Sequence, residues 1–180
     1  MDDTLTGVER VLRQLHGRLP RQLFVLAGPS GVGKNTIIKR ILTNHPHVMD
    51  RVRTYTTRPP RGDEKSGEQY HFVSREACRE LALAGRLMEA DAATAGHDVY
   101  GEGHLYSMPA DLFAAIPPDR HLVLAEVDIY GMRLLKERHP DCITIFVTAP
   151  PLALLDRIRE RAGDDECRED LVKRMETARE

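Results

Sequence analysis

The chain alternates between short apolar runs and longer amphipathic segments. Apolar runs of this kind are typical of strands that a parallel sheet buries on both faces, and they cover residues 23–27, 52–56, 121–128 and 142–148. Apolar residues at helical spacing separate these runs, over residues 35–45, 129–139 and 152–162. Strand–helix alternation builds right-handed parallel units, so the sequence predicts an α/β fold with helices on both faces of a parallel sheet.

One stretch, residues 54–108, breaks this alternation. It opens with the turn-rich, charged segment TRPPRGDEKSGE and continues into a short strand pattern, QYHFVS, and a helix pattern, REACRELALAG. We therefore expect an inserted α+β region between two core segments, 22–53 and 109–180. The second core segment is expected to begin with a helix in PADLFAAI, and its polar stretch at about 158–172 is expected to form a short lid.

The first 21 residues follow a pattern of their own. Thr6 and Glu9 form a capping-box pattern, and apolar residues recur at helical spacing at Leu5, Val8, Val11, Leu12, Leu15 and Leu19. This predicts an amphipathic helix over residues 1–21. Two placements stay open for it, the surface of the main domain and a contact between two copies of the chain, so we expect a monomer or a homodimer.

Composition narrows the classes of partner. The 180 residues carry a formal net charge of −2, which gives no global signal for nucleic acid or for an anionic membrane. The three cysteines, Cys78, Cys142 and Cys167, form no CxxC pair, which argues against a zinc cluster or a disulfide framework. No apolar stretch reaches the roughly 18–20 residues of a membrane span, so we expect a cytoplasmic protein without nucleic-acid or membrane partners.

A glycine-rich loop follows the first predicted strand. Residues 28–35 spell G-x-x-x-x-G-K-N between a strand and a helix, which is the context of a phosphate-binding loop. The glycines permit positive φ, so backbone N–H groups can converge on phosphate oxygens at the positive end of the helix dipole. The sequence thus predicts a phosphate-loop NTPase type of fold, with an ATP-binding set of Gly28, Pro29, Ser30, Gly31, Val32, Gly33, Lys34, Asn35 and Thr36.

Asn35 stands where such loops normally place a serine or threonine hydroxyl on magnesium. Its side-chain oxygen is a neutral hard donor that Mg²⁺ accepts directly or through water, which makes Asn35 the candidate metal ligand. Thr36 is a poor substitute, because one step along a helix turns the side chain by about 100°. Three interpretations remain open: a tolerated asparagine, a weakened affinity for magnesium, and a loss of catalysis.

A second anion site is predicted after the second apolar run. Arg58 and Arg61 flank a Pro-Pro pair that stiffens the chain between them. Two guanidinium groups with the Tyr70 hydroxyl would form a receptor for a phosphate monoester. The alternative is a solvated basic turn, and this segment alone does not decide between the two.

With GPSGVGK and TTRPPRGDEKSGEQYHFVS at this separation, the chain resembles the guanylate kinases, which move a phosphoryl group from ATP to GMP. The resemblance runs from about Leu23 to Glu180. It implies an enzyme that phosphorylates GMP, and dGMP as well, with Mg²⁺ accompanying ATP. It also implies that Arg58, Arg61 and Tyr70 clamp the GMP phosphate.

Further residues take implied roles from the same resemblance. Thr54 matches a serine that reads the guanine base, and Glu89 matches the glutamate that accepts hydrogen bonds from guanine N1 and N2. Glu64 and Asp128 match acidic residues near the acceptor and the metal. Arginines that close on the donor phosphates complete the implied catalytic set, which is Lys34, Arg58, Asp128, Arg157, Arg161 and Arg174. Spacing alone would also allow Arg157 and Arg161 to be solvated on one helix face.

The loop before residue 109 departs from the family pattern and leaves two registers open. In the preferred one, GHLYSMP places Tyr106 on the acceptor phosphate and puts Met108 where a hydroxyl helps to read guanine. In the other, Tyr100 takes the place of Tyr106. Tyr130 stands where a glutamine is common, a difference of packing. The family normally adds a strand and a helix after the position where this sequence ends, and that strand contributes to the adenine pocket.

Two other functions are compatible with a chain that resembles this family. One is a kinase for a different phosphorylated acceptor, such as a ribose bisphosphate or another nucleoside monophosphate. The other is a non-catalytic module that binds protein partners. The presence of Glu89 argues against the first, and the presence of Lys34, Asp128 and both sets of arginines argues against the second.

Overall fold

The central layer is a parallel sheet of four strands. The computed structural model describes residues 11, 21–89, 96, 98 and 103–162. Strands β1 (Gln22–Ala27), β2 (Met49–Arg51), β6 (Leu122–Glu126) and β7 (Ile143–Phe146) lie in the order β2-β6-β1-β7. Each neighbouring pair is parallel, as the sequence predicts.

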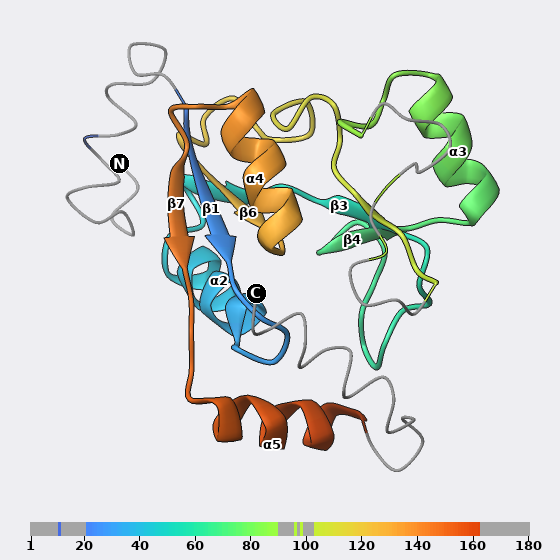
Figure 1. Ribbon diagram of the computed structural model, residues 1–180. Helices are drawn as coiled ribbons and strands as arrows, with labels where there is room; N and C mark the ends of the chain where they lie inside the picture. The colour runs from blue at the N-terminus through green and yellow to red at the C-terminus, as the bar shows by residue number, and fades with distance from the viewer. Residues whose placement is uncertain (1–10, 12–20, 90–95, 97, 99–102, 163–180) are drawn as a thin grey trace.

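Two helices cover opposite faces of this sheet, as expected. Helix α2 (Lys34–Asn44) follows β1, and α4 (Ile129–Arg138) follows β6; Figure 1 shows α4 in front of the sheet and α2 behind it. Side chains alternate between the faces of a strand. Val25 therefore packs with Leu135 of α4, whereas Leu26 packs with Ile38 of α2, and all four side chains are buried.

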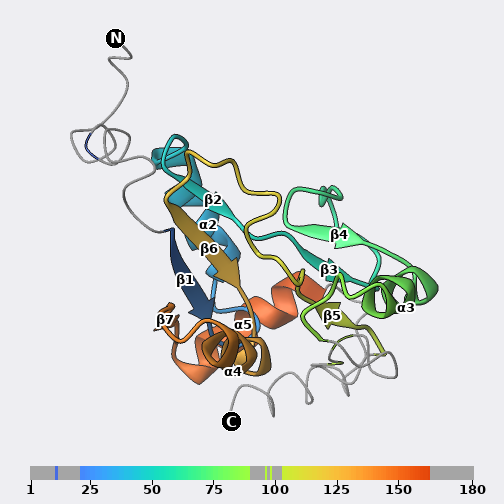
Figure 2. The ribbon, with the colours of Figure 1, turned by 90° about the horizontal axis from the view of Figure 1, so that it is seen from above.

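A second, smaller sheet lies to one side of the first (Figure 2). It contains β3 (Thr54–Thr56), β4 (Tyr70–Phe72) and β5 (Tyr106–Ser107) in the order β4-β3-β5, with β4 parallel and β5 antiparallel to β3. Helix α3 (Arg75–Leu83) follows β4 and begins at Ser74, whose side chain accepts from the Ala77 N–H. Cys78 and Ala82 of this helix are buried with Leu87 in a separate apolar cluster.

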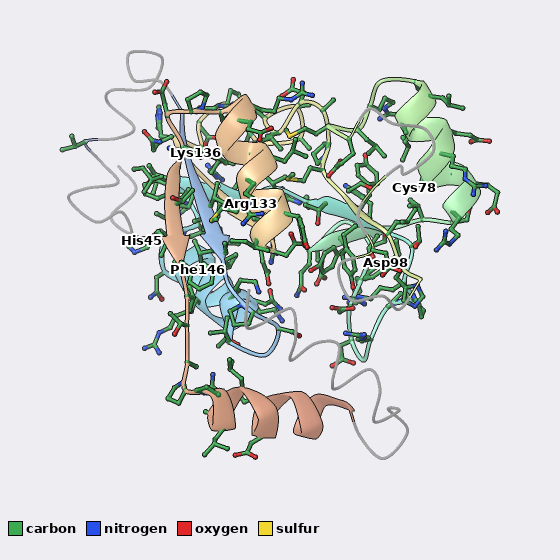
Figure 3. The ribbon with its side chains drawn as sticks, in the orientation of Figure 1. His45, Cys78, Asp98, Arg133, Lys136 and Phe146 are labelled. Atoms are coloured by element: carbon green, nitrogen blue, oxygen red, sulfur yellow. The ribbon has the colours of Figure 1, made fainter. Side chains whose placement is uncertain are left out.

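The strand β7 forms one edge of the central sheet and is more exposed than the sequence predicts. Ile143, Ile145 and Phe146 are exposed, although an apolar run suggests burial on both faces. Phe146 is labelled on this strand in Figure 3. Helix α5 (Pro151–Ala162) lies beyond the carboxyl ends of β1 and β7 in Figure 1, so it does not cover the exposed side chains of β7. Lys136 near the end of α4 donates to the Cys142 carbonyl at 3.0 Å and so holds the start of this edge strand.

The predicted strand over residues 52–56 is confirmed only in part, because Thr54–Thr56 form β3, which belongs to the second sheet and not to the central one. The chain leaves the first sheet after Arg51 and enters the second at Thr54, so this run joins two sheets. The Val52 N–H still donates to the Leu124 carbonyl at 2.8 Å, and the Val52 side chain lies in the main core. The fourth strand of the central sheet is instead β2 (Met49–Arg51), which lies just before the predicted run and pairs with β6.

The predicted helix in PADLFAAI is wrong, because residues 109–116 form turns. The Asp111 carboxylate accepts from the Phe113 N–H at 2.9 Å, a local bond that competes with helix formation. Leu112 and Ile116 are nevertheless buried in the main core. Apolar spacing therefore reports burial here and not helical backbone.

Two expected elements lie largely outside the described residues. They are the amphipathic helix over 1–21 and the part of the lid after residue 162. The division into a core and an insertion over 54–108 stays a prediction, although all three strands of the second sheet fall within that range. None of the helices in the described part of the chain is long and apolar enough to cross a membrane.

Candidate functional site

The turn between β1 and α2 has the backbone of an anion-binding loop. Gly28, Gly31 and Gly33 have φ values of 150°, 80° and 97°, a region that glycine adopts without strain. Gly33, which has no side chain, is the N-cap of α2, and the first turn of this helix holds no acidic residue. The first N–H groups of α2, at the positive end of its dipole, are therefore available to a phosphate.

Two cations lie against this loop. The Lys34 ammonium donates to the Gly28 carbonyl at 2.6 Å and to the Pro29 carbonyl at 3.1 Å, so it is folded onto the loop. The Arg157 guanidinium donates to the Val32 carbonyl at 3.3 Å, although its own helix α5 is more than a hundred residues further along the chain. The fold thus brings one arginine of the predicted donor set to the phosphate loop.

Asn35 has a partner that the sequence did not indicate. Its side-chain oxygen accepts from Arg51 Nη1 at 3.1 Å, and Arg51 Nη2 donates to a Glu126 carboxylate oxygen at 3.1 Å. Arg51 is 5% exposed, so this guanidinium is buried between the ends of β2 and β6. The candidate metal ligand is therefore engaged by a cation of the protein itself.

The described side chains do not form a metal site around Asn35. Within the described ranges, no group of three or more His, Cys, Asp or Glu side chains could hold a metal ion. A magnesium ion at Asn35 would need the oxygen that Arg51 uses, and it would meet a charge of the same sign. The role of Asn35 as a metal ligand stays a prediction that this geometry disfavours.

The predicted acceptor site is built around one buried arginine. Arg58 follows β3 and is 6% exposed, and its two terminal nitrogens donate to the two oxygens of Glu64 at 2.6 and 2.9 Å. Glu64 also accepts from the Arg61 N–H at 2.9 Å. A bidentate pair of this kind fixes the plane of the guanidinium. The basic segment is therefore folded around Arg58, and the alternative of a fully solvated turn does not hold for that residue.

Aromatic rings flank the same guanidinium. Its central carbon lies 5.1 Å from the ring centroid of Tyr70 and 5.3 Å from that of Phe72, both on β4. Tyr106 on β5 meets Tyr70 edge to face, with 6.2 Å between centroids. Rings at these distances attract the cation and limit its movement. The preferred register therefore places Tyr106 beside the predicted acceptor clamp, whereas Tyr100 lies outside the described residues.

The charges of this pair reinforce one another. Burial raises the pKa of Glu64, but the hydrogen bonds from Arg58 and from the Arg61 N–H outweigh it and lower that pKa overall. Burial opposes the charge of Arg58 as well, yet the Glu64 hydrogen bond and the nearby tyrosines raise its pKa above the ordinary value. Both groups stay ionised at neutral pH, so Arg58 keeps the positive charge that a phosphate receptor requires.

Glu89 lies at the end of the second sheet. Its carboxylate accepts from the Met108 N–H at 2.9 Å, directly after β5. The Met108 side chain is 3% exposed and belongs to the main core, so the base-reading role that its position implied does not fall to that side chain. Thr54 is buried at the start of β3, paired in register with Tyr70.

Asp128 is half-buried and serves as the N-cap of α4, accepting from the Gly131 N–H at 2.8 Å. It follows β6 and therefore lies at the carboxyl end of the central sheet, where β1 leads into the phosphate loop. Arg174 and the side chain of Arg161 lie outside what the structure describes. Their predicted contacts with the donor phosphates stay predictions.

Sequence reasoning missed three residues of these sites. Phe72 was present in the quoted segment, and alternation along β4 puts it on the same face as Tyr70. Glu126 precedes Asp128 by two residues, a spacing that would have indicated a pair of carboxylates at one strand end. Arg51 had no usable signal, because only the pairing of β2 with β6 brings it to Asn35.

Comparison with known proteins gives the same assignment along nearly the whole chain. The family model for guanylate kinase matches residues 20–180. A guanylate kinase of Nostoc sp. is 34% identical over 163 residues, which are 90% of this chain and 76% of that protein. The human guanylate kinase is 35% identical over 155 residues, 86% of this chain and 74% of that protein.

A solved structure agrees on the fold. The crystal structure of guanylate kinase from Anaplasma phagocytophilum superimposes with a TM-score of 0.58 and 23% identity, covering 89% of this chain and 69% of that one. At this identity the likeness bears on the α/β phosphate-loop kinase fold alone. The family match over residues 20–180, with relatives 34% and 35% identical over most of the chain, shows that the chain belongs to the guanylate kinase family.

Proposed function

We propose that this protein transfers the γ-phosphoryl group of ATP to GMP, giving ADP and GDP, and that dGMP is an alternative acceptor. The observation that carries the proposal is the buried Arg58, which Glu64 holds against the rings of Tyr70 and Phe72. These rings belong to the smaller sheet, which lies beside the central sheet (Figure 2). A phosphate monoester is the ligand that such a fixed guanidinium suits best. The named relatives, all called guanylate kinase, support the choice of GMP.

Arg58 retains donors for this task. Its hydrogen bonds to Glu64 and to the Pro59 carbonyl use three N–H groups, whereas a guanidinium has five. We propose that the remaining donors, with the Arg61 guanidinium and the Tyr70 and Tyr106 hydroxyls, hold the GMP phosphate. One oxygen of the GMP phosphate then faces the γ-phosphorus of ATP. This oxygen forms a bond to the γ-phosphorus while the bond between the γ-phosphorus and the β-phosphate oxygen of the departing ADP breaks.

Phosphoryl transfer of this kind depends on position and charge neutralisation more than on a strong base. We propose that the first N–H groups of α2 and Lys34 hold the donor phosphates, and that Arg157, with Arg161 and Arg174, stabilises charge on the group in transfer. Asp128 is proposed to lie near the acceptor. Glu89 is proposed to select guanine, because a carboxylate pairs with two adjacent donors that adenine lacks. ATP is proposed to enter as its magnesium complex.

A coupled assay of ADP formation tests this function. Wild-type protein is incubated with ATP, Mg²⁺ and one of GMP, dGMP, AMP, UMP or ribose 1,5-bisphosphate, and turnover is expected with the guanine nucleotides. Replacing Arg58 by Met is expected to lower kcat/KM for GMP by about 100-fold. This factor corresponds to the loss of one or two charge-assisted hydrogen bonds from Arg58 to the GMP phosphate. Arg79→Met, at an exposed position of α3, is the matched control and should leave turnover unchanged.

The competing functions give different results in this assay. Turnover of a sugar phosphate with negligible turnover of GMP would replace the guanylate assignment with another acceptor. Absence of phosphorylation of any acceptor, with an intact fold by circular dichroism, would favour the protein-binding module.

A further inference from the structure

A buried arginine beside the phosphate loop donates hydrogen bonds to the Asn35 amide oxygen and to a Glu126 carboxylate oxygen. Arg51, the last residue of β2, reaches Asn35 with one terminal nitrogen and Glu126 with the other, each at 3.1 Å. Asn35 lies in the first turn of α2, and Glu126 is the last residue of β6. One guanidinium therefore ties the helix that follows the phosphate loop to two strands of the central sheet.

Burial makes this contact a strong constraint. The side chains of Arg51 and Glu126 are 7% and 14% exposed, and Arg51 Nε has no hydrogen-bond partner among the described residues. A buried charge is unfavourable unless it is paired, so the two acceptors are what this guanidinium relies on. Withdrawal of the Asn35 oxygen to ligate a metal would leave a second donor of Arg51 unsatisfied.

Charge argues in the same direction. A magnesium ion bound by Asn35 would lie about 2.0–2.1 Å from that oxygen, and therefore close to the guanidinium that the same oxygen accepts from. Two cations of like sign around one neutral amide repel each other. The carboxylate that would offset the ion, Glu126, is already paired with Arg51.

We propose that Arg51 is a resident cation that replaces protein ligation of magnesium at Asn35. The metal that accompanies ATP is then held by phosphate oxygens and water, and Arg51 is a positioning residue that orients the first turn of α2 through Asn35. This inference rests on the proposed use of ATP, and it explains why asparagine stands at this position: its amide oxygen is an acceptor for Arg51.

The test separates affinity for nucleotide from affinity for metal. The dissociation constant of a non-hydrolysable ATP analogue is measured by calorimetry in excess Mg²⁺ and in EDTA, for wild type, Asn35→Ala and Arg51→Met. Each variant is expected to weaken binding by a similar factor, about tenfold, in both media, so the ratio of the two constants stays within about twofold of wild type. Arg40→Met, an exposed arginine on the same helix, is the control and should change neither constant.

A loss in Asn35→Ala that is tenfold or more in Mg²⁺ and absent in EDTA would overturn the proposal, because it would identify Asn35 as a ligand of the metal. If neither wild type nor any variant binds the analogue in either medium, the proposed function fails. The role of Arg51 is then tested separately, by the binding of Mn²⁺ to the nucleotide-free protein. Electron paramagnetic resonance is then expected to show at least tenfold tighter Mn²⁺ binding by Arg51→Met than by wild type. Equal Mn²⁺ affinities of wild type and Arg51→Met would overturn the inference. If Arg51→Met does not fold, wild type is compared with Asn35→Ala instead. Mn²⁺ binding that wild type shows and Asn35→Ala lacks would then overturn the inference.

Discussion

The pair formed by Arg58 and Glu64 gives the sharpest prediction about stability, through the substitution Glu64→Gln. This change keeps the size of the side chain and removes its charge. It also replaces one acceptor oxygen by an NH₂ group, which faces a donor of Arg58. Of the three hydrogen bonds that Glu64 accepts, at 2.6, 2.9 and 2.9 Å, at least one is lost and the others lose their charge-assisted character.

The expected cost follows from the burial of the two partners. Hydrogen bonds to charged groups contribute about 1.5–3 kcal/mol each, and an uncompensated buried charge costs more. Arg58 is 6% exposed, but Glu64 is 21% exposed, so water can replace part of what the glutamine lacks. We expect a loss of about 2 kcal/mol in the free energy of unfolding at neutral pH, which corresponds to about 4–8 °C in Tm for a chain of this size.

The pH dependence provides the assay. Because the pKa of Glu64 is lowered in the folded state, its contribution to stability is present above the unfolded value of 4.5 and is lost as pH falls through the lower, folded pKa. Below that point wild type carries a neutral carboxyl group that resembles glutamine. Urea unfolding of wild type and Glu64→Gln, measured from neutral pH to about pH 3, should therefore show two stabilities that converge in acid.

A difference between the two proteins that stays constant over this pH range would refute the reasoning, since it would show that shape and not charge matters at this position. Glu68→Gln is the control, because Glu68 is an exposed residue of the same segment. Its stability should follow wild type at every pH.

Three further predictions concern the core, the phosphate loop and an acid-sensitive histidine. Ile38→Ala removes a fully buried side chain of α2 and should cost about 2–5 kcal/mol in urea unfolding, whereas Ile37→Ala, at an exposed position, should cost less than about 1 kcal/mol. Gly28→Ala combines an unfavourable φ of 150° with a Cβ that would overlap the Val147 carbonyl, so calorimetry should show weaker ATP binding. Gly62→Ala is the control, because its added Cβ would contact no neighbouring atom, and it should bind ATP as wild type does. Burial and the neighbouring Arg53 lower the pKa of His71, so unfolding should become easier as pH falls below the ordinary value of 6.5; a His71→Gln protein whose stability keeps this dependence would contradict the assignment.

Local patterns along the chain were enough to identify most helices and the class of fold. Strand–helix alternation predicted the parallel sheet and the positions of α2, α4 and α5, and a separate helical pattern predicted α3. These predictions succeeded because a helix that packs on a sheet has apolar residues at helical spacing on its buried face. The phosphate loop was equally readable, since its glycines, its lysine and its flanking elements are contiguous. Errors occurred where an apolar pattern had two explanations. Residues 52–56 supplied a strand of the second sheet instead of the central one, and residues 109–116 formed buried turns instead of a helix.

The candidate site was predictable only in part. Arg58, Glu64 and Tyr70 lie within one continuous segment, so a sequence motif could indicate them together. Their mutual geometry needed the fold, because Tyr70 reaches Arg58 through the pairing of β3 with β4. Tyr106 joins them from a distant segment through the antiparallel pairing of β5.

Asn35 shows most clearly what belongs to each level. The sequence alone determined that an amide replaces the usual hydroxyl at the start of the helix after the phosphate loop. It left open whether that amide binds a metal, weakens its binding or marks the loss of catalysis. Tertiary structure supplied the missing partner, since parallel pairing of β2 with β6 brings Arg51 and Glu126 together beside Asn35. The physical reason is that a hydrogen bond between residues distant in sequence depends on strand register, which no local pattern encodes.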